Sequence, residues 1–377
     1  MSVLYYAAFI PGLRNFIDGV IRERLSDVKI HKLLEDAVLF ETQTTYDKLN
    51  FFCFNNIFAV ISVLGETRAQ AGGGKKLLED HIGYISGIKT QNTNDGFRIK
   101  TPLSDINFDP VAVNNKKFKT FRIVVLNENV PASIDEKLRT EAEHFISGVS
   151  GLKVNRALPD TEFWFLYWKH RSKRPNGEKT EGQSFSIFMK RLTLRASWEK
   201  TLQKGELPPP LAWTMCRMAS LKQKQTVLDP FCGYGSIPDS AIKHFHITDF
   251  IACDSGRQSV LFTEARLKKR KNGNFSVYSA DIGSLPLLIA EESIDAIVTD
   301  PPWGQFSKIN DSGFLKNMFD VFSRLLKDGG RAVILYLNDD NFLKAAELNF
   351  NLLDSFPVLL SGKKTVIYTL TRKNRQP

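Results

Sequence analysis

The sequence predicts an α/β protein whose C-terminal part is a doubly wound parallel sheet with one reversed strand, preceded by an α+β region. Three observations support this prediction. Strand-like and helix-like segments alternate regularly from residue 226 onward. The segment 207–212, Leu-Pro-Pro-Pro-Leu-Ala, marks a domain boundary, because three prolines end any element and start a new helix. Four predicted strands end in aspartate, which places four carboxylates at the edge where α/β sheets bind ligands.

The first 64 residues have the pattern of a strand–helix–strand unit followed by a second helix. We expect strands at Val3–Ile10 and Ala37–Glu41, and between them a helix at Leu13–Leu25, whose apolar residues recur near helical spacing. Glycine- and asparagine-rich stretches predict loops over much of 65–115. The low charge of the first unit indicates packing rather than chemistry.

The segment 116–206 continues the α+β pattern. A helix is expected at Pro131–Phe145, with Ser133 as N-cap and Glu136 completing a capping box. The apolar runs predict strands at Phe118–Leu126, Leu152–Val154, Phe163–Trp168 and Phe185–Thr193.

The C-terminal region predicts five βα units and a final hairpin, which together make a seven-stranded sheet. Helices are expected from about Leu211, Pro238, Arg257, Phe314 and Asp340. The predicted strands are Thr226–Asp229, Phe250–Asp254, Phe275–Asp281, Ile294–Asp300, Arg331–Leu337, Leu352–Leu360 and Thr365–Leu370.

The charge distribution points to a polyanionic partner. The 377 residues carry a formal net charge of +10, and residues 151–205 hold 12 Lys and Arg against 5 Asp and Glu. A basic run at 169–174 directly follows the aromatic strand Phe163–Trp168, so we expect phosphate contacts there; the alternative is a solvated charged face. The candidate RNA-binding residues are Lys169, Arg171, Lys173, Arg174, Lys190, Arg191 and Arg195.

Cysteine and histidine usage predicts a cytoplasmic protein without a metal site. The four cysteines are scattered and form no Cys-x-x-Cys pair. The pair His244 and His246 is read as the last turn of a helix, since no third ligand is nearby. The apolar segment 50–64 is too short to span a bilayer, and the N-terminus lacks the basic region of a signal peptide.

The turn after the first C-terminal strand predicts the cofactor. It reads Asp-Pro-Phe-Cys-Gly-Tyr-Gly-Ser over residues 229–236. No Gly-Lys-Ser/Thr follows, which excludes a P-loop, and Pro238 stands where a dinucleotide fingerprint needs a third glycine. Asp229 would also oppose a pyrophosphate. A cofactor with a sulfonium, an ammonium group and no phosphate fits better, and this is S-adenosylmethionine.

The later strand ends extend this cofactor site. Asp254 is placed to accept from ribose hydroxyls and Asp281 from the adenine amino group. Each aspartate alone could instead be a turn or cap residue, but four in register make coincidence unconvincing. The candidate cofactor-binding residues are Pro210, Asp229, Phe231, Cys232, Gly233, Gly235, Ser236, Asp254, Asp281 and Ile282.

The tetrapeptide Asp300-Pro301-Pro302-Trp303 predicts the catalytic chemistry. It follows a short apolar strand, and the two prolines hold Asp300 in stiff, extended backbone at the strand end. The carboxylate and the Pro301 carbonyl are two acceptors that match the two donors of an exocyclic NH₂, and the indole can stack on the base. The alternative is an ordinary loop with Asp300 as a helix cap.

These motifs resemble those of class I methyltransferases that act on exocyclic amines. Together with the preceding Leu-Pro-Pro-Pro-Leu-Ala, they are similar to the THUMP-domain RNA methyltransferases of the tRNA guanine-N2 methylase family. The resemblance implies a ferredoxin-like domain at 1–64, a THUMP-like RNA-binding domain at 65–168, a basic linker at 169–206 and a Rossmann-like methyltransferase domain at 207–377. It also implies that the tRNA acceptor end is the bound partner.

The predicted function is therefore methyl transfer from S-adenosylmethionine to the exocyclic N2 of a guanosine in tRNA. Two alternatives stay open: adenine-N6 methylation of RNA or DNA, because Asp-Pro-Pro-Trp also occurs in those enzymes, and a catalytically silent RNA-binding protein. We expect a monomer that does not bind membranes. The need for a small activating subunit is left open by the sequence.

Overall fold

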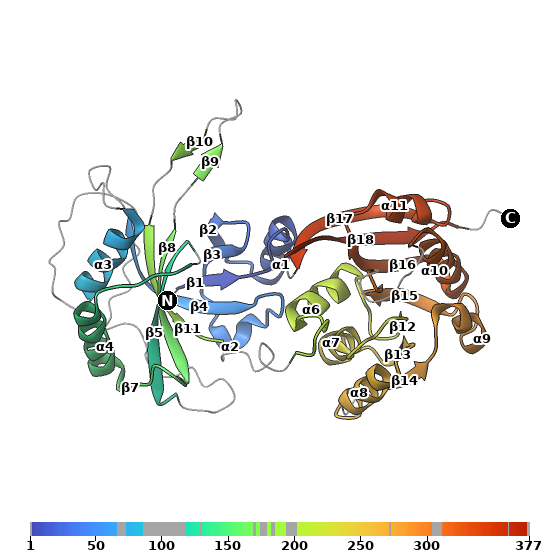
Figure 1. Cartoon of the computed structure of the whole chain (residues 1–377), viewed down its shortest axis with the longest axis horizontal. Helices are drawn as coiled ribbons and strands as arrows, with labels where there is room; N and C mark the ends of the chain where they lie inside the picture. Colours follow the sequence, from blue (N-terminus) through green and yellow to red (C-terminus); the bar gives the residue numbers. More distant parts are fainter. Residues whose placement is uncertain are drawn as a thin grey trace. The chain divides into compact units, whose positions relative to one another are not determined.

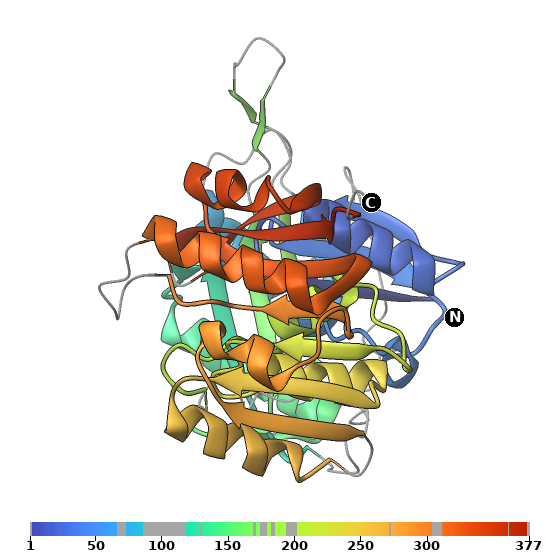
Figure 2. The same ribbon diagram turned by 90° about the vertical axis from the view of Figure 1, so that its right-hand side faces the viewer.

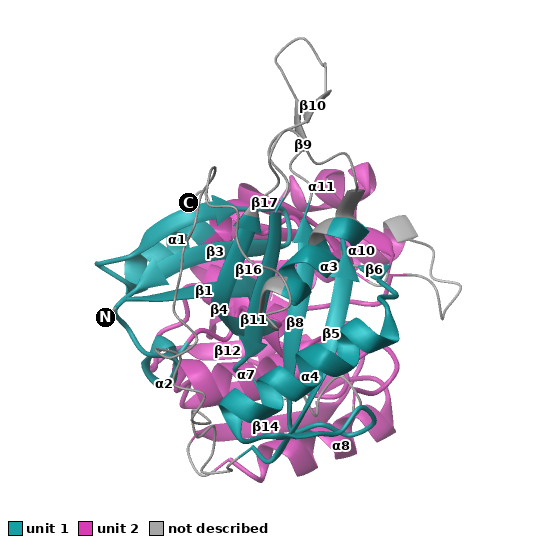
Figure 3. Ribbon diagram, turned by 90° about the vertical axis from the view of Figure 1, so that its left-hand side faces the viewer, with its two compact units in different colours: residues 1–8, 18–50, 56–197 teal, residues 9–17, 51–55, 198–377 magenta. Residues whose placement is uncertain are grey.

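The computed structural model describes residues 2–65, 73–85, 118–128, 130–168, 171–173, 179–181, 185–193, 202–270, 273–303, 311–360 and 362–374 (Figure 1). The chain forms two compact units (Figure 3). Unit 1 comprises residues 1–8, 18–50 and 56–197, and unit 2 comprises residues 9–17, 51–55 and 198–377. Two short N-terminal segments therefore belong to the C-terminal unit, which the sequence did not predict.

The first six elements have the order βαββαβ, and their strands lie in the order β2-β3-β1-β4. This is the ferredoxin-like arrangement that the resemblance implies. The predicted second helix is reduced to one turn, and the apolar residues after it form a strand. The elements are β1 (Val3–Ala8), α1 (Arg14–Arg24), β2 (Lys29–Leu33), β3 (Ala37–Thr42), α2 (Tyr46–Leu49) and β4 (Asn56–Gly65).

The remaining elements of unit 1 extend the same sheet. Strand β4 pairs with β11, so that the sheet continues as β4-β11-β8-β5-β6, with β7 on β5. The predicted boundary at 64/65 thus falls at the end of a strand that both predicted modules share, and the predicted domain limits stay a prediction. The elements are α3 (Gly73–Ile85), β5 (Thr120–Asn127), β6 (Val130–Pro131), α4 (Glu136–Ser150), β7 (Lys153–Val154), β8 (Thr161–Trp168), β9 (Arg171–Lys173), β10 (Lys179–Glu181) and β11 (Phe185–Arg191).

Helices α3 and α4 cover one face of this sheet (Figure 3). Phenylalanines of β5, β8 and β11 pack beneath them, and Phe165 stacks on Phe188 with ring centroids 4.4 Å apart. The N-cap of α4 is Asp135, which accepts from the Leu138 amide at 3.1 Å. The predicted cap Ser133 is wrong, because the helix begins three residues later at Glu136.

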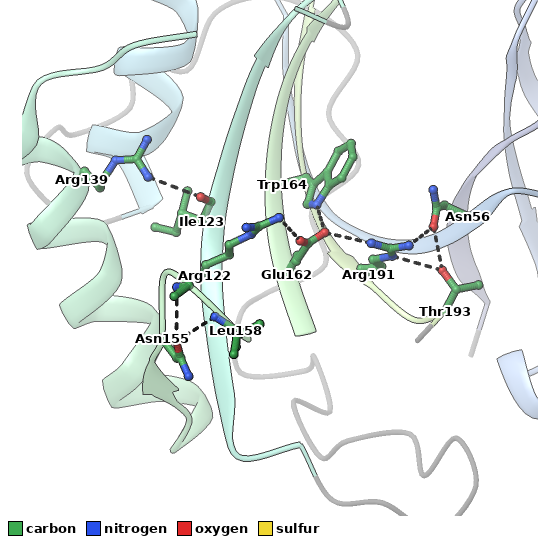
Figure 4. A network of polar contacts seen from close by, with 11 residues as sticks. Asn56, Arg122, Ile123, Arg139, Asn155, Leu158, Glu162, Trp164, Arg191 and Thr193 are labelled. Atoms are coloured by element: carbon green, nitrogen blue, oxygen red, sulfur yellow. Dashed lines mark hydrogen bonds and ion pairs between the residues drawn. The ribbon is translucent and has the colours of Figure 1, made fainter. Parts of the chain in front are cut away.

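A polar network crosses the four central strands of unit 1 (Figure 4). Glu162 of β8 accepts from Arg122 at 2.5 Å, from Arg191 at 3.0 Å and from the Trp164 indole at 2.9 Å. Burial opposes the charge of Glu162, but the bond from Trp164 and the two guanidinium charges lower its pKa. Arg191 also donates to Asn56.

The structure contradicts the predicted RNA-binding role of two residues of β11, Lys190 and Arg191. Arg191 is only 4% exposed and Lys190 only 3%, and the Lys190 ammonium lies 5.8 Å from the centroid of the Phe118 ring. Both belong to β11, a central strand of the sheet rather than part of a basic linker. An RNA phosphate cannot reach such side chains, so their charges stabilise the fold of unit 1 instead.

Unit 2 contains a seven-stranded sheet in the order β14-β13-β12-β15-β16-β18-β17. Strand β18 runs antiparallel to both of its neighbours and the other pairs are parallel, which confirms the doubly wound sheet with one reversed strand. The strands are β12 (Thr226–Asp229), β13 (Asp249–Asp254), β14 (Asn274–Ser279), β15 (Ile294–Thr299), β16 (Leu326–Leu337), β17 (Phe350–Leu360) and β18 (Lys363–Arg372).

Helices lie on both sides of this sheet (Figure 1), and Figure 2 faces the side that carries α9 and α10. The triple proline starts α6 as predicted, because proline is favoured in the first helical turn. Within the described residues, no helix combines the length and apolar character needed to cross a membrane. The helices are α6 (Pro209–Met218), α7 (Ser236–Phe245), α8 (Arg257–Leu267), η3 (Ile282–Ser284), α9 (Leu285–Leu288), α10 (Asp311–Leu325) and α11 (Asp340–Ala346).

The two N-terminal segments of unit 2 are held by aromatic contacts. In segment 9–17, the Phe16 ring meets the Phe356 ring of β17 at 6.0 Å. In segment 51–55, Phe52 lies 3.9 Å from the imidazole of His244, between ring centroids. At Gly12 the backbone has φ +97°, and a Cβ would stand 1.8 Å from the Pro357 carbonyl oxygen. Segment 9–17 thus approaches β17 more closely than any side chain permits.

We predict that Gly12→Ala destabilises the protein while Gly19→Ala, in the open middle of α1, does not. The first change has two penalties. An alanine at positive φ costs roughly 1–2 kcal/mol of backbone strain, and its Cβ would overlap the Pro357 carbonyl oxygen. The second meets nothing within 4 Å and removes a helix glycine, a gain of up to about 1 kcal/mol. Thermal unfolding of the two variants measures this, and equal melting temperatures would contradict the close approach.

Candidate functional site

A cavity of about 240 Å³ opens in unit 2 at the carboxyl edge of the parallel strands. It brings together the turn after β12, the end of β13 and the end of β15, as the predicted register requires. Its lining residues are Gly205, Glu206, Leu207, Asp229, Phe231, Cys232, Gly233, Tyr234, Ser236, Ile237, Asp254, Ser255, Asp300 and Pro302. Asp300 and the glycine turn therefore share one cavity.

The glycine turn is held in a single conformation by its own backbone. The Gly235 amide donates to the Cys232 carbonyl at 2.8 Å, and the Cys232 amide donates to the Cys253 carbonyl of β13 at 2.8 Å. Gly235 has φ +80°, and a Cβ there would meet the Thr263 hydroxyl at 2.8 Å. The Thr263 hydroxyl itself donates to the Gly233 carbonyl at 2.8 Å. Gly235 thus shapes the turn, and the described residues that line the cavity do not include it.

Asp254 is fixed at the end of β13 by two backbone amides. Its Oδ2 accepts from the Gly233 amide at 2.9 Å and its Oδ1 from the Gly256 amide at 2.7 Å. A carboxylate has about four acceptor positions, so these bonds orient it and leave capacity for a ligand hydroxyl. The placement fits the predicted contact with ribose.

Asp300 and Trp303 are joined directly. The Trp303 indole donates to Asp300 Oδ1 at 2.9 Å. Pro302 lines the cavity, whereas Pro301 is buried beneath it. The ammonium of Lys363, which begins β18, lies over the Trp303 ring at 5.7 Å from its centroid. The indole thus contacts both a carboxyl group and a cation.

Asp229 links the two strands that flank the cavity. Its Oδ1 accepts from the Thr299 hydroxyl of β15 at 2.7 Å and from the Phe231 amide at 3.2 Å. Its pKa is raised to about 7: burial is the main cause, the charge of Asp254 adds to it, and these two hydrogen bonds oppose it.

The pKa of Asp300 also lies well above its usual value. Burial is the main cause; the indole bond from Trp303 opposes it, and the charge of Asp229 adds to it. The two carboxyl groups therefore repel one another across neighbouring strand ends. A positively charged ligand in the cavity would relieve this repulsion, and a negatively charged one would increase it.

Besides Gly235, three predicted cofactor residues lie outside this cavity's lining. Pro210 is buried within α6, and Ile282 is buried in the core beneath α10. Asp281 caps η3 by accepting from the Ser284 amide at 3.1 Å, and it lines a neighbouring hollow of about 330 Å³. Ser255 lines both the hollow and the cavity, so Asp281 stands next to the site rather than in it.

The sequence did not point to several residues that line the cavity. Gly205, Glu206 and Leu207 come from the segment before α6, and Tyr234 and Ser255 come from the two turns. Tyr234 and Ser255 stand beside predicted residues and could have been included. Glu206 gave no signal, because its partner Arg266 lies 60 residues away.

The predicted basic surface is only partly described. Lys169, Arg174 and Arg195 lie outside the described residues. Arg171 and Lys173 lie in β9, which pairs with β10. As predicted, His244 and His246 lie at the end of α7. In the described part of the chain, no group of three His, Cys, Asp or Glu side chains is placed to hold a metal ion.

The strand order and the ligand edge define unit 2 as a class I methyltransferase fold. Residues 197–357 match the family model of the RMKL-like methyltransferase domain. The whole chain superimposes on the crystal structure of TrmN from Thermus thermophilus with a TM-score of 0.70 at 17% identity, covering 98% of this chain and 99% of that one. The full-length fold is thus that of TrmN.

Curated relatives are guanine-N2 RNA methyltransferases. The chain is 29% identical over 160 residues to the U6 snRNA (guanine-N(2))-methyltransferase of Homo sapiens, covering 41% of this chain and 31% of the relative. It is 26% identical over 239 residues to the tRNA (guanine(10)-N2)-dimethyltransferase of Methanocaldococcus jannaschii, covering 61% and 65%. The match to the human relative spans about a third of its length. The resemblance to this class of enzymes is confirmed.

We predict that Asp229→Asn stabilises the cofactor-free protein more at pH 8 than at pH 5. A carboxyl pKa raised from 3.8 to about 7 favours the folded state fully below pH 4, and this contribution is lost as the pH rises through 7. Asparagine stays neutral and keeps an acceptor for the Thr299 hydroxyl. The gain is at most about 4 kcal/mol, from about three pKa units.

Chemical denaturation across this pH range measures the difference. Asp249→Asn, at the exposed opposite end of β13, serves as control and should show no such trend. A stability gap between Asp229→Asn and the wild type that does not change with pH would contradict the raised pKa.

Proposed function

We propose that this protein is an S-adenosylmethionine-dependent RNA methyltransferase that modifies the exocyclic N2 of a guanosine in tRNA. The observation that carries the proposal is the position of Asp300: it lines the same cavity as Gly233 and Asp254. A cofactor held by the glycine turn and a base held by Asp300 would then lie within reach of each other. The guanine-N2 activity of the curated relatives supports the choice of atom.

The cavity and the hollow beside it carry carboxyl groups that match the cationic and hydrogen-bond-donating groups of this cofactor. S-adenosylmethionine supplies a methyl group on a positively charged sulfur. A sulfonium or ammonium group in the cavity would favour the ionised forms of Asp229 and Asp300, whereas a pyrophosphate would disfavour them. Asp254 would accept from the ribose hydroxyls, and the adjoining hollow at Asp281 would take the adenine.

The Asp300 tetrapeptide would hold the target base. An amino group can donate to the Asp300 carboxylate and to the Pro301 carbonyl, and the indole bond to Oδ1 still leaves acceptor positions on that carboxylate. With both N–H bonds fixed, the nitrogen lone pair faces the methyl donor. Methyl transfer to this nitrogen would break the C–S bond and release the neutral thioether. The carboxylate would offset the positive charge that develops on nitrogen, and the methylated amine would then lose a proton to Asp300 or to solvent.

We propose that the RNA is held by basic residues outside the cavity. Lys169, Arg171, Lys173, Arg174 and Arg195 remain candidates for phosphate contacts, and the predicted THUMP-like and ferredoxin-like regions would bind the acceptor end of tRNA. The relatives act on tRNA or on U6 snRNA, so either RNA is chemically suitable. The four cysteines are free and buried, which supports a reducing compartment such as the cytoplasm.

The experiment that tests the proposal is nucleoside mass spectrometry. The purified protein is incubated with S-adenosylmethionine and with tRNA, U6 snRNA or DNA, and the digested nucleosides are compared with a reaction lacking protein. N2-methylguanosine in the tRNA supports the proposal. N6-methyladenosine, N6-methyldeoxyadenosine or no methylated nucleoside with any substrate overturns it, and methylation of U6 snRNA alone overturns the tRNA assignment.

We predict that Asp300→Ala lowers turnover by roughly a hundred- to a thousand-fold, the loss typical of one group that stabilises transition-state charge. RNA affinity should stay within about threefold, because phosphate contacts supply most binding. Single-turnover methylation and filter binding measure the two quantities.

Asp295→Asn is the matched control for this substitution. Asp295 lies on the same strand, β15, but accepts from the Thr226 amide at 2.8 Å and from Lys327 at 2.7 Å. It should keep wild-type turnover. Equal losses of turnover and RNA binding in Asp300→Ala would refute the catalytic assignment.

A further inference from the structure

One wall of the cavity is formed by the segment 203–207, here called the strap. Gly205, Glu206 and Leu207 of the strap line the cavity together with Gly233 and Asp254. The strap is a tight turn: the Glu206 amide donates to the Gln203 carbonyl at 3.0 Å, and Gly205 has φ +85°. It precedes α6 and has no strand to hold it in place.

A buried carboxylate anchors the strap. The Glu206 side chain is 2% exposed, and its Oε1 accepts from Arg266 Nη2 at 2.6 Å and from the Ser236 hydroxyl at 3.1 Å. Its Oε2 accepts from the Gln203 amide at 2.9 Å. The ion pair thus ties the strap to α8, while the Ser236 hydroxyl ties it to the first turn of α7.

Arg266 also packs on a ring that contacts the glycine turn. Its guanidinium lies over the Phe262 ring, 5.2 Å from the centroid, and Phe262 meets the Tyr234 ring edge-on at 5.3 Å. Tyr234 belongs to the glycine turn and lines the cavity. A chain of contacts therefore runs from the glycine turn through α8 to the strap.

We propose that Arg266 is a positioning residue for cofactor binding, acting through Glu206 to hold the strap against the cavity. This inference rests on the proposed binding of S-adenosylmethionine in the cavity. Arg266 does not line the cavity, so it would affect a bound cofactor through its partners: Glu206 of the strap, and Ser236, to whose hydroxyl its Nη1 donates at 3.4 Å. A buried carboxylate that loses its cationic partner must find water or a proton, and either response moves the strap outward.

The neighbouring ion pair provides a matched control. Arg270 follows Arg266 by four residues and binds Asp239 of α7 through two bonds of 2.5 and 2.7 Å. This pair also ties the start of α7 to the end of α8, but neither residue lines the cavity or touches the strap. Arg270→Gln therefore reports the cost of losing a similar ion pair without a change in the strap.

The test combines calorimetry with hydrogen exchange on the full chain. Arg266→Gln should weaken S-adenosylmethionine binding roughly tenfold, the size expected for one charge-assisted hydrogen bond, and raise the cofactor KM with little change in kcat. In the cofactor-free protein it should speed amide exchange in the strap peptide. Arg270→Gln should leave affinity within about twofold and strap exchange unchanged, and Arg266→Lys should recover part of the affinity.

The outcomes separate the inference from the proposed function. If the wild type does not bind S-adenosylmethionine, the proposed function fails. If the wild type binds and Arg266→Gln binds as tightly, or if Arg270→Gln weakens binding equally, the positioning role is wrong. Should Arg266→Gln unfold, Arg266→Lys and Glu206→Gln carry the same measurement, and unchanged affinity in both overturns the inference.

Discussion

The burial of two neighbouring carboxyl groups, Asp229 and Asp300, is the constraint on which the site depends. Both carboxyl groups stand at the ends of neighbouring parallel strands, and the Thr299 hydroxyl bond to Asp229 joins those ends. Burial makes each charge costly, so the pKa of each group rises. The two carboxyl groups stay close together because the parallel pairing of β12 with β15 brings the ends of these strands side by side. A bound cation would lower this free-energy cost, so the cavity favours positively charged ligands over negatively charged ones.

Much of this arrangement follows from the sequence because it is local. Local signals determine the backbone of each part: the strand pattern, the proline pair after Asp300 and the glycines of the turn each affect only a few neighbouring residues. The strand order of the sheet then brings these parts to one edge. The carboxyl ends of the unit 2 strands were predicted within two residues, and the largest differences include Asp281, which lies two residues beyond β14. There the backbone leaves the sheet at Ser279, and Asp281 caps η3 instead.

What the sequence concealed depends on distant partners. Arg191 and Lys190 look like surface charges, yet Arg191 meets Glu162 from β8 and both are buried. Nothing near position 191 announces that partner. Glu206 likewise meets Arg266 only because the segment before α6 returns past α8. A strand with a buried ion pair and a strand with a basic surface can have the same amino-acid composition, so only the folded structure distinguishes them.

A cavity that contains two buried carboxyl groups can accept a cation and can also bind a neutral base. The indole bond to Oδ1 lowers the cost of the Asp300 charge, and the indole itself is contacted by the Lys363 ammonium. Once a sulfonium lies between the acids, the ionised form of Asp300 is favoured, and an ionised carboxylate is a stronger acceptor for an amine. Cofactor binding would then prepare the base site, so that the amine is gripped only when a methyl donor is present.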